Sequence, residues 1–436
     1  MEDLRIKRLV INKLGVFEHL DLSFEKNKLE DKAEIHIFTG ENGTGKSTLL
    51  EALTFFDSVY NEYLRDDRKD IDNSSFIKKI WGDRKHPELG IGLYFEKRKL
   101  EFFNFGFNEN IDDLNFWNLY YRLLQQEDIK DYHSYNFFAY NGHRQLRDTN
   151  VEVMKKIDFN PITEALIFDK TNTNVNLFQW IANNKTRAAL AFQKGKIKDS
   201  ENYLFSIQRI EKAIGEIIGK DISFILDEHL LNVMVKINDI PIYYNTLADG
   251  YKSIISWLTD LIFRLDYMPS EGKENFTLFL DEIDIHLHPA AQRRILPVIQ
   301  KLFPKAQIFL TTHSPFIIGS IDGAWVYKFK LDEKGNSVLD GKPFLTEDAK
   351  SYRYILEQVF DINKQFGIEI EKRLDEFYKI RDEIIKNSTV ISTNGPSVHG
   401  LTKIARELAV QSEELRAIMG NELKQLSRII KKEITL

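Results

Sequence analysis

The sequence contains no cysteine among its 436 residues. Disulfide bonds, thiolate zinc sites and cysteine nucleophiles are therefore excluded. The sequence also lacks an apolar run of the roughly 18 residues that would span a bilayer, and its first residues have no signal-peptide core. These absences favour a cytoplasmic protein that does not associate with a membrane.

Positive charge is also in short supply, because 66 acidic residues outnumber 60 Lys and Arg residues and give a net charge of −6. The chain as a whole is therefore not expected to attract nucleic acid. Lysine and arginine do gather within residues 78–99. We interpret this stretch as a solvated face, with a local patch that contacts DNA as the alternative.

What the sequence does have is a set of short apolar strands, of the kind buried in an α/β sheet. One of them, "EIHIF", runs directly into "TGENGTGKSTLL", and a helical pattern follows from Ser47 to about Phe56. Two more, in "FTLFLDEID" and "AQIFLTTHSP", end in acidic residues and in hydroxyl or histidine residues. Antiparallel hairpins are predicted at residues 91–107, 222–244 and 325–344.

Toward the C-terminus the pattern becomes helical, with amphipathic segments at 368–386 and 400–434 and a polar break between them. We therefore expect two domains. The first, 1–345, has a mixed β-sheet core, an antiparallel β lobe and a helical insertion at about 175–218. The second, 346–436, is a helical hairpin. The apolar stripe of its second helix has two interpretations, packing within its own domain or docking of a partner.

Residues 40–48, "GENGTGKST", fit the phosphate-binding pattern GxxxxGK[ST] in its required place between a strand and a helix. Gly43 and Gly45 let the backbone turn tightly, so that its N–H groups point at phosphate oxygens. Lys46 would bridge the β- and γ-phosphates, and the Ser47 hydroxyl would bind Mg²⁺. The expected ligands are therefore ATP and Mg²⁺. The predicted nucleotide-binding residues are Asn42, Gly43, Thr44, Gly45, Lys46, Ser47 and Thr48.

Two later strands supply the acidic and imidazole groups that such a site needs. Asp281 ends the strand in "FTLFLD" and is the predicted carboxylate ligand of Mg²⁺. Glu282 follows it and would polarise an attacking water. His313, in "TTHSP", would sense the γ-phosphate from the end of another strand. The predicted catalytic residues are therefore Glu282 and His313.

The segment "LADGY" contains Ala248, Asp249 and Gly250 and opens a long apolar helix pattern that runs to about Met268. By itself it is a plausible helix start. Its position between the phosphate-binding motif and Asp281 favours a second interpretation, a motif that contacts nucleotide.

Together, "GENGTGKST", "LADGY", "LFLDEIDIHLHP" and "TTHSP" resemble the motifs of ABC-type ATPases of the RecF, SMC and overcoming-lysogenisation-defect (OLD) superfamily. The resemblance covers about residues 1–345 and implies an ABC-type ATPase head. It also implies a homodimer in which "LADGY" of one subunit, the signature motif, faces the nucleotide of the other. A further implication is a Q-loop in "FAYNGHRQL", where Gln145 would reach Mg²⁺, with Asn141 and Arg144 as alternatives.

The usual form of the signature motif has serine where this chain has Ala248. In the family that hydroxyl would bond the γ-phosphate across the interface. A hydrogen bond to a charged group contributes about 1.5–3 kcal/mol, or roughly ten- to hundredfold in rate if it acts in the transition state. We therefore expect ATP-dependent assembly with slow hydrolysis.

After Thr346 the sequence predicts helices and contains no Asp-x-Asp, which the TOPRIM nuclease domain of OLD proteins would need. An OLD-like core with a helical tail resembles the PtuA family, the ATPases of Septu anti-phage systems that also accompany some retrons. The AriA family of PARIS systems is a second match. The resemblance implies a sensor and scaffold that forms higher homo-oligomers and controls a separate nuclease, of HNH (PtuB-like) or TOPRIM type. A RecF-like repair ATPase that binds DNA directly is the alternative.

Overall fold

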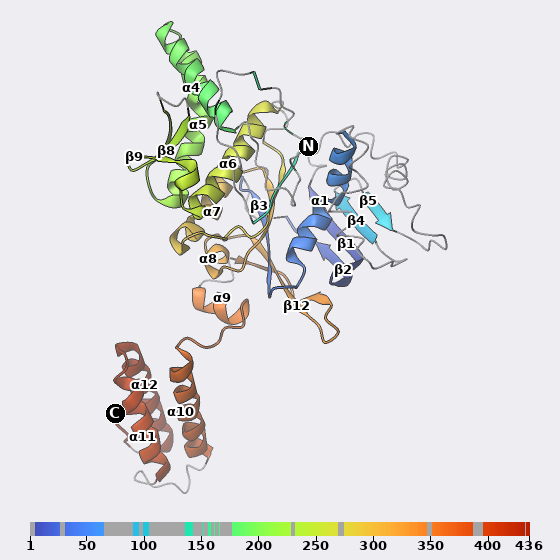
Figure 1. Cartoon of the computed structure of the whole chain (residues 1–436). Helices are drawn as coiled ribbons and strands as arrows, with labels where there is room; N and C mark the ends of the chain where they lie inside the picture. Colours follow the sequence, from blue (N-terminus) through green and yellow to red (C-terminus); the bar gives the residue numbers. More distant parts are fainter. Residues whose placement is uncertain are drawn as a thin grey trace. The chain divides into compact units, whose positions relative to one another are not determined.

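The computed structural model forms two compact units, Met1–Phe360 and Asp361–Leu436 (Figure 1). The structure describes residues 5–26, 31–64, 90–95, 99–103, 136–142, 151, 156–157, 161, 165, 177–227, 232–268, 274–346, 351–386, 396–431 and 433–436. Among these residues there is no helix with the length and apolar character that a bilayer crossing requires. The first unit extends beyond residue 345 because α9 (Tyr352–Gln358) buries Ile355 in its core.

The centre of the first unit is a mixed sheet of seven strands, in the order β13-β12-β3-β11-β10-β6 with β14 paired to β12. The strands are β3 (Glu34–Gly40), β6 (Phe137–Tyr140), β10 (Thr277–Leu280), β11 (Gln307–Thr311), β12 (Trp325–Leu331), β13 (Ser337–Leu339) and β14 (Phe344–Leu345). From β12 to β6 all neighbours are parallel, whereas β13 and β14 run antiparallel to β12. The carboxyl ends of β3, β11, β10 and β6 therefore share one edge, where sheets of this kind bind ligands.

The predicted β lobe is an antiparallel sheet in the order β2-β1-β4-β5. Its strands are β1 (Ile6–Leu14), β2 (Phe17–Ser23), β4 (Gly90–Phe95) and β5 (Lys99–Phe103). A separate three-stranded sheet contains β7 (Ile222–Leu226), β8 (Val233–Ile237) and β9 (Ile240–Tyr243). Asn238 and Asp239 connect β8 to β9 with φ values of 46° and 68°. Two positive φ values in a two-residue loop are typical of a type I′ turn, as the sequence predicts.

In the part of the first unit that the structure describes, the long helices beside the two larger sheets are α1 (Lys46–Leu64), α4 (Leu177–Gln193), α5 (Ile197–Ile218), α6 (Asp249–Tyr267) and α7 (Pro289–Leu302). The predicted helical insertion is thus the pair α4 and α5. Figure 1 shows α4 to α7 on one side of β3, and α1 with the antiparallel sheet on the other.

Both faces of the central sheet are covered, which explains why β10 and β11 are buried along their whole length. Ile37, Leu278 and Leu310 point into the core formed with α4 to α7. Phe279 and Phe309, which alternate with them along β10 and β11, point into the core formed with the antiparallel sheet and stack at 5.5 Å. The period of two along β10 and β11 therefore sorts aliphatic side chains to one face and aromatic side chains to the other.

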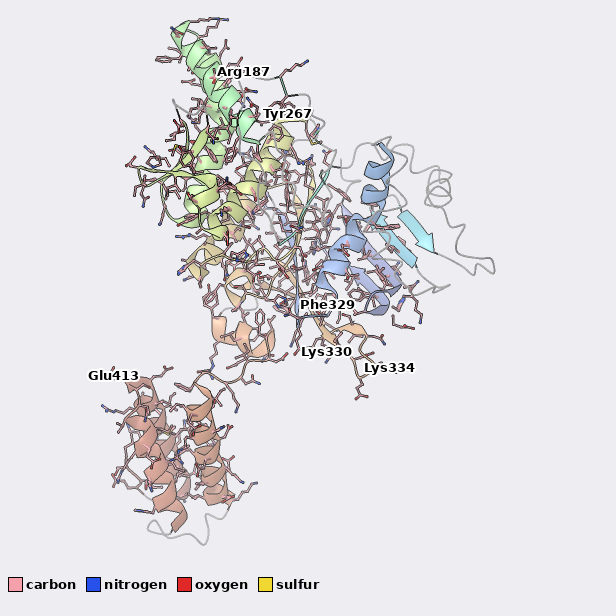
Figure 2. All side chains as sticks on the ribbon, viewed as in Figure 1. Arg187, Tyr267, Phe329, Lys330, Lys334 and Glu413 are labelled. Carbon is pink, nitrogen blue, oxygen red and sulfur yellow. The ribbon has the colours of Figure 1, made fainter. Side chains whose placement is uncertain are left out.

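The same alternation continues on β12 (Figure 2). Phe329 is buried, whereas the side chain of Lys330 is 57% exposed, and Lys334 lies at the outer turn between β12 and β13. The described fold of the first unit therefore has the predicted class, a mixed sheet with an antiparallel lobe and a helical insertion.

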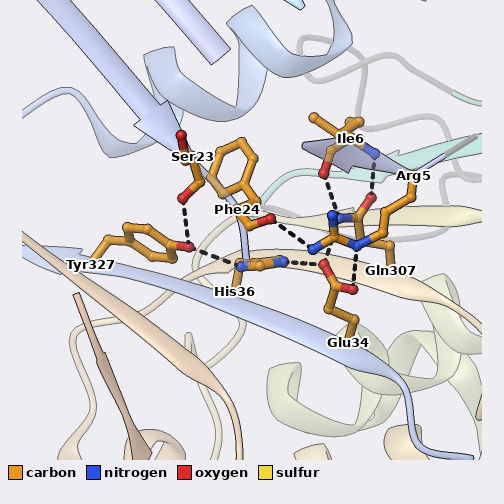
Figure 3. A network of polar contacts seen from close by, with 8 residues as sticks. All are labelled: Arg5, Ile6, Ser23, Phe24, Glu34, His36, Gln307 and Tyr327. Carbon is orange, nitrogen blue, oxygen red and sulfur yellow. Dashed lines mark hydrogen bonds and ion pairs between the residues drawn. The ribbon is translucent and has the colours of Figure 1, made fainter. Parts of the chain in front are cut away.

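At the amino-terminal end of β3 and β11, a buried polar network joins the central sheet to β1 (Figure 3). The Glu34 carboxylate accepts from Arg5 Nε at 2.6 Å and lies 2.6 Å from His36 Nε2. The side-chain amide of Gln307 pairs with both backbone groups of Ile6, at 2.9 Å each. These contacts hold the two sheets together.

Burial and hydrogen bonding shift the titration of this network. Burial lowers the pKa of His36, although the neighbouring Glu34 carboxylate acts in the opposite direction. Burial alone would raise the pKa of Glu34, but its bonds to His36 and Arg5 outweigh that effect and hold the pKa below its usual value. Near neutral pH the network therefore contains the Arg5–Glu34 ion pair and a neutral imidazole.

Over its described residues, the second unit is a bundle of three helices, α10 (Ile368–Lys386), α11 (Pro396–Ala409) and α12 (Glu413–Ile430), and not the predicted hairpin of two. The long helix predicted over 400–434 breaks because Ser412 caps α12, accepting from the Leu415 N–H at 3.1 Å. The predicted apolar stripe is buried in the bundle core, through Leu401, Ile404, Leu408, Leu415, Met419, Leu423 and Leu426. Packing within its own unit is therefore the interpretation that the structure supports.

Candidate functional site

The predicted phosphate-binding loop lies between β3 and α1, at the carboxyl edge of the central sheet. At Gly45 φ is 81°, a value that side chains rarely adopt. A Cβ there would also lie 2.7 Å from the ring of Phe17. Around Gly43, in contrast, no atom lies within 4 Å of the position of an added Cβ among the described residues. The loop is therefore packed against β2 on one side and borders open space on the other.

Lys46, the first residue of α1, keeps its ammonium group within this loop. Its Nζ donates to the carbonyl oxygens of Gly40 at 3.0 Å and Glu41 at 2.8 Å. Burial lowers the pKa of Lys46, while the carboxylates that follow β10 act in the opposite direction. Lys46 therefore presents a partly desolvated positive charge to those carboxylates.

The other loop residues have mixed surroundings. Thr44 is buried, its hydroxyl donates to the Glu41 carbonyl at 2.8 Å, and its own carbonyl accepts from Ser337 Oγ at 2.7 Å. Asn42 is exposed, and Ser47 and Thr48 are half-buried on the first turn of α1. Thr44 thus anchors the loop to β13, while Asn42 stays open to solvent.

Asp281 and Glu282 follow β10 directly and share one threonine partner. Thr311 Oγ1 donates to Asp281 Oδ1 at 2.6 Å and accepts from the Glu282 N–H at 2.7 Å. The next residue, Thr312, donates to Asp284 Oδ1 at 2.5 Å. Two adjacent hydroxyls at the end of β11 therefore fix the carboxylates at the end of β10. In the "TTHSP" motif the sequence interpretation used only the histidine and missed both threonines.

The backbone at Glu282 is in an uncommon conformation, with a φ of 45°. Its carboxylate lies against the chain that leaves β6, because a Cβ on Gly142 would be 2.8 Å from Glu282 Oε2. The sequence interpretation did not identify Gly142 either. A glycine in "FAYNG" is the only signal, and it does not show which side chain this residue faces.

His313 is half-buried beside the same groups. Burial first, and then the charge of Lys46, lower the pKa of His313, while Asp281 and Glu282 act in the opposite direction. The imidazole is therefore neutral near pH 7, with one N–H donor and one acceptor nitrogen. The structure thus brings Lys46, Asp281, Glu282 and His313 to one place.

Two sequence predictions fall outside the described residues, namely Gln145 with its alternative Arg144, and most of the basic stretch at 78–99. The other alternative for the Q-loop, Asn141, is described and follows β6 at the same edge of the sheet.

The signature segment is a helix start, as its local pattern predicts. Ala248 is the N-cap residue of α6, with an extended backbone (φ −62°, ψ 145°), and no side chain caps the helix. Asp249 and Gly250 form the first turn. A Cβ on Gly250 would lie 2.5 Å from the carbonyl oxygen of His286. The start of α6 is therefore packed against the loop that follows the acidic pair, and its contact with a nucleotide stays a prediction.

Comparison with known families gives two matches. The family described as "AAA domain, putative AbiEii toxin, Type IV TA system" matches residues 35–319, and a second family, described as "AAA domain", matches residues 4–58. The first match runs from β3 to α8 (Pro315–Ile318) and includes the phosphate-binding loop, Asp281, Glu282 and His313.

Curated relatives agree with the predicted resemblance. The chain is 24% identical to "Septu protein PtuA" of Bacillus thuringiensis over 393 residues, which cover 87% of this chain and 89% of that protein. It is 25% identical to "Retron Vc95 probable ATPase" of Vibrio cholerae over 367 residues, covering 68% of this chain and 70% of that one.

Among solved structures, an SMC head bound to the C-winged helix domain of ScpA is 13% identical, with a TM-score of 0.42, covering 79% of this chain and 98% of that chain. The sequence resemblance to ABC-type ATPases of the PtuA kind is confirmed by the curated relatives. Because the first family match covers most of the first unit, the chain belongs to the AAA-domain family that matches its residues 35–319.

Proposed function

We propose that the chain binds ATP with Mg²⁺ in the loop at residues 40–48 and hydrolyses it slowly as an ABC-type homodimer. One observation carries this proposal. Lys46 after β3, Asp281 and Glu282 after β10, and His313 after β11 lie at one edge of the sheet, because these strands are parallel neighbours, although the residues are far apart in the sequence. The lysine cation matches the phosphates of a nucleoside triphosphate, and the carboxylates match its metal ion.

The described residues fit both groups. Gly43 borders open space beside the Lys46 ammonium, which leaves room for phosphate. Ser47 and Asp281 supply oxygen donors, the ligands that Mg²⁺ prefers. When bound, Mg²⁺ would offset the negative charge of the phosphates. The Thr311 hydroxyl already holds one oxygen of Asp281, so the direction of this carboxylate is set by the protein.

The remaining residues have roles that follow from their contacts. Glu282, held through its backbone by Thr311 and flanked by Gly142, would orient and polarise the attacking water. Neutral His313 would donate a hydrogen bond to the terminal phosphate. The segment 248–250 would face the nucleotide of a second copy. Because alanine at position 248 lacks the hydroxyl that serine would offer to the phosphate, turnover would be slow.

We also propose that this ATPase works in anti-phage defence as a sensor and scaffold that controls a separate nuclease, of HNH (PtuB-like) or TOPRIM type. The similarity to Septu PtuA over most of both chains supports it. The second unit is the candidate region for docking or oligomerisation. Its core is self-contained, and it exposes Ile368 and Val410 by more than three quarters.

Nucleotide titration of the full chain tests the first proposal. We expect the wild type to bind ATP with Mg²⁺ and to form a dimer in sedimentation experiments, Glu282→Gln to accumulate the ATP-bound dimer, and Lys46→Ala to lose both properties. Lys334→Ala is the matched control, because this lysine lies at an outer turn. Equal ATP affinity of the Lys46 variant and the wild type would disprove the proposed site.

Co-expression with a candidate nuclease, of HNH (PtuB-like) or TOPRIM type, tests the second proposal. We expect the two proteins to purify together, and to separate when residues 361–436 are removed. Protection of cells from phage should require both genes and Lys46. ATP turnover that DNA stimulates, with binding that weakens steeply as salt increases, would instead favour the DNA-repair alternative.

A further inference from the structure

A group of three buried polar residues joins α6 to β6 beneath the candidate site. The Tyr140 hydroxyl donates to Asp260 Oδ2 at 2.9 Å, and Arg264 Nε donates to the same oxygen at 2.6 Å. Arg264 Nη1 also donates to the carbonyl of Pro161 at 2.9 Å. The side chains of Asp260 and Arg264 are 1% and 3% exposed. One carboxylate oxygen thus connects a helix to a strand of the central sheet.

A contribution to the stability of the fold does not by itself explain this group. Removing two charges from water costs several kcal/mol per ion, and apolar residues of similar volume often stabilise a fold as well or better. In addition, Asp260 Oδ1 is buried and has no hydrogen-bond partner among the described residues. A buried carboxylate that is only half satisfied, in the middle of a large apolar core, indicates a purpose other than folding.

The position of Tyr140 suggests that purpose. It is the last residue of β6, and its carbonyl oxygen accepts from the Asp281 N–H at 2.9 Å. Two residues later, Gly142 lies against the carboxylate of Glu282. The backbone from Tyr140 to Gly142 therefore contacts both predicted acidic residues, and the hydroxyl of Tyr140 fixes it to α6.

The other end of α6 carries the signature segment. Asp260 lies about 16 Å along the helix from Asp249, at roughly 1.5 Å per residue. At that end, Gly250 is packed against the carbonyl of His286, in the loop after Glu282. The helix therefore touches the acidic segment at two places, once at the start and once through Tyr140.

We infer that Tyr140, Asp260 and Arg264 are positioning residues, which fix Asp281 and Glu282 relative to α6 and so couple the signature end of this helix to the chain's own acidic pair. In the dimer, the same helix contacts the partner's nucleotide at one end. Binding of the partner's nucleotide against α6 then determines the position of Glu282. This inference rests on the proposed ATP site and adds its coupling.

Tyr140→Phe is the direct test, because it removes one oxygen atom and keeps the ring. We expect the ATP affinity to stay within about twofold of the wild type, since no phosphate-binding residue changes. The single-turnover hydrolysis rate should fall by about ten- to hundredfold, because a small misplacement at a catalytic site can cost that much. Tyr327→Phe is the matched control. It removes another buried hydroxyl, in the network at the opposite end of the sheet, and should leave the rate unchanged.

A second variant separates positioning from folding. Replacement of all three residues by apolar ones, in Tyr140→Phe/Asp260→Leu/Arg264→Met, should keep or raise the melting temperature while the hydrolysis rate falls as in the single variant. A purely structural group would leave the rate of this stable variant at the wild-type value, and that result would overturn the inference. If Lys46→Ala binds ATP like the wild type, the proposed site itself is wrong. If Tyr140→Phe hydrolyses ATP at the wild-type rate while Lys46→Ala loses ATP binding as expected, the coupling is rejected and the proposed site stands.

Discussion

The two ends of β3 and β11 hold buried charges in opposite ways. At the amino ends, Glu34, His36 and Gln307 form hydrogen bonds to one another and to the antiparallel sheet (Figure 3). At the carboxyl ends, the Lys46 ammonium donates its hydrogen bonds, among the described residues, to backbone carbonyls alone. Its charge instead acts on carboxylates nearby.

This difference separates a structural polar cluster from a binding site. In the amino-end network each charged side chain has a partner of the opposite charge, so a ligand would gain little there. At the carboxyl end, Lys46 donates to carbonyls of its own loop, and Asp281 accepts from the Thr311 hydroxyl of the neighbouring strand. Charged groups that neutral groups hold in position can act on a ligand at no cost of reorganisation.

The largest effect is expected at the structural end. Glu34→Gln leaves Arg5 without its carboxylate, which should lower the free energy of unfolding by about 3 kcal/mol without changing ATP affinity. Chemical denaturation and nucleotide titration would measure the two quantities. Asp21→Asn, which breaks the exposed Arg8–Asp21 pair, is the control and should cost less than about 1 kcal/mol. A large loss of ATP affinity in Glu34→Gln would break the distinction between the two ends.

At the nucleotide end, Ala248→Ser should raise the hydrolysis rate by roughly ten- to hundredfold, because the hydroxyl adds a hydrogen bond to a charged phosphate. The structure adds a second effect, since Ala248 is the N-cap of α6 and serine caps helices about 1 kcal/mol better than alanine. Ala248→Asp separates the two. It should cap the helix and raise the melting temperature, but its charge should repel phosphate and keep turnover slow. Fast wild-type turnover that serine leaves unchanged would contradict the expectation.

Thr311→Val removes the hydroxyl that orients Asp281 and accepts from the Glu282 N–H. The unpaired N–H should cost about 1–3 kcal/mol, and higher Mg²⁺ concentrations should be needed for hydrolysis. Thr311→Ser keeps the hydroxyl and is the matched control. The Mg²⁺ dependence of single-turnover hydrolysis measures the effect, and identical curves for Val and Ser would exclude this role of the hydroxyl.

The smallest effect concerns pH. Burial lowers the pKa of His36 from its ordinary value of 6.5, so below that pH the unfolded chain binds a proton that the folded chain does not. The free energy of unfolding should therefore fall as the pH decreases from 6.5, by at most about 1.4 kcal/mol per pH unit for one group, with no contribution above it.

His36→Gln should flatten this dependence more than His313→Gln does, because His36 is fully buried and His313 only half-buried. Denaturation at several pH values between 5 and 8, on the scale where histidine titrates, measures the slopes. A larger change with the His313 variant would reverse the comparison.

The sequence predicts some of these features and not others, for physical reasons. The phosphate-binding loop is local, so spacing alone places Gly43, Gly45 and Lys46 between a strand and a helix. The partnership of Thr311 with Asp281 depends on β10 and β11 being neighbours in the sheet, which no local pattern encodes. The break in the long C-terminal helix depends on a single cap at Ser412, and the helical periodicity on both sides conceals it.

The pairing of Gln307 with Ile6 has a mechanical consequence. A side-chain amide that bonds to both the N–H and the carbonyl of one residue substitutes for a rung of β-ladder between β11 and the start of β1. The same strand ends at Thr311, and the antiparallel sheet supplies Phe17 behind Gly45. The antiparallel sheet therefore braces the central sheet at two points, the amino end of β11 and the glycine loop at the opposite edge.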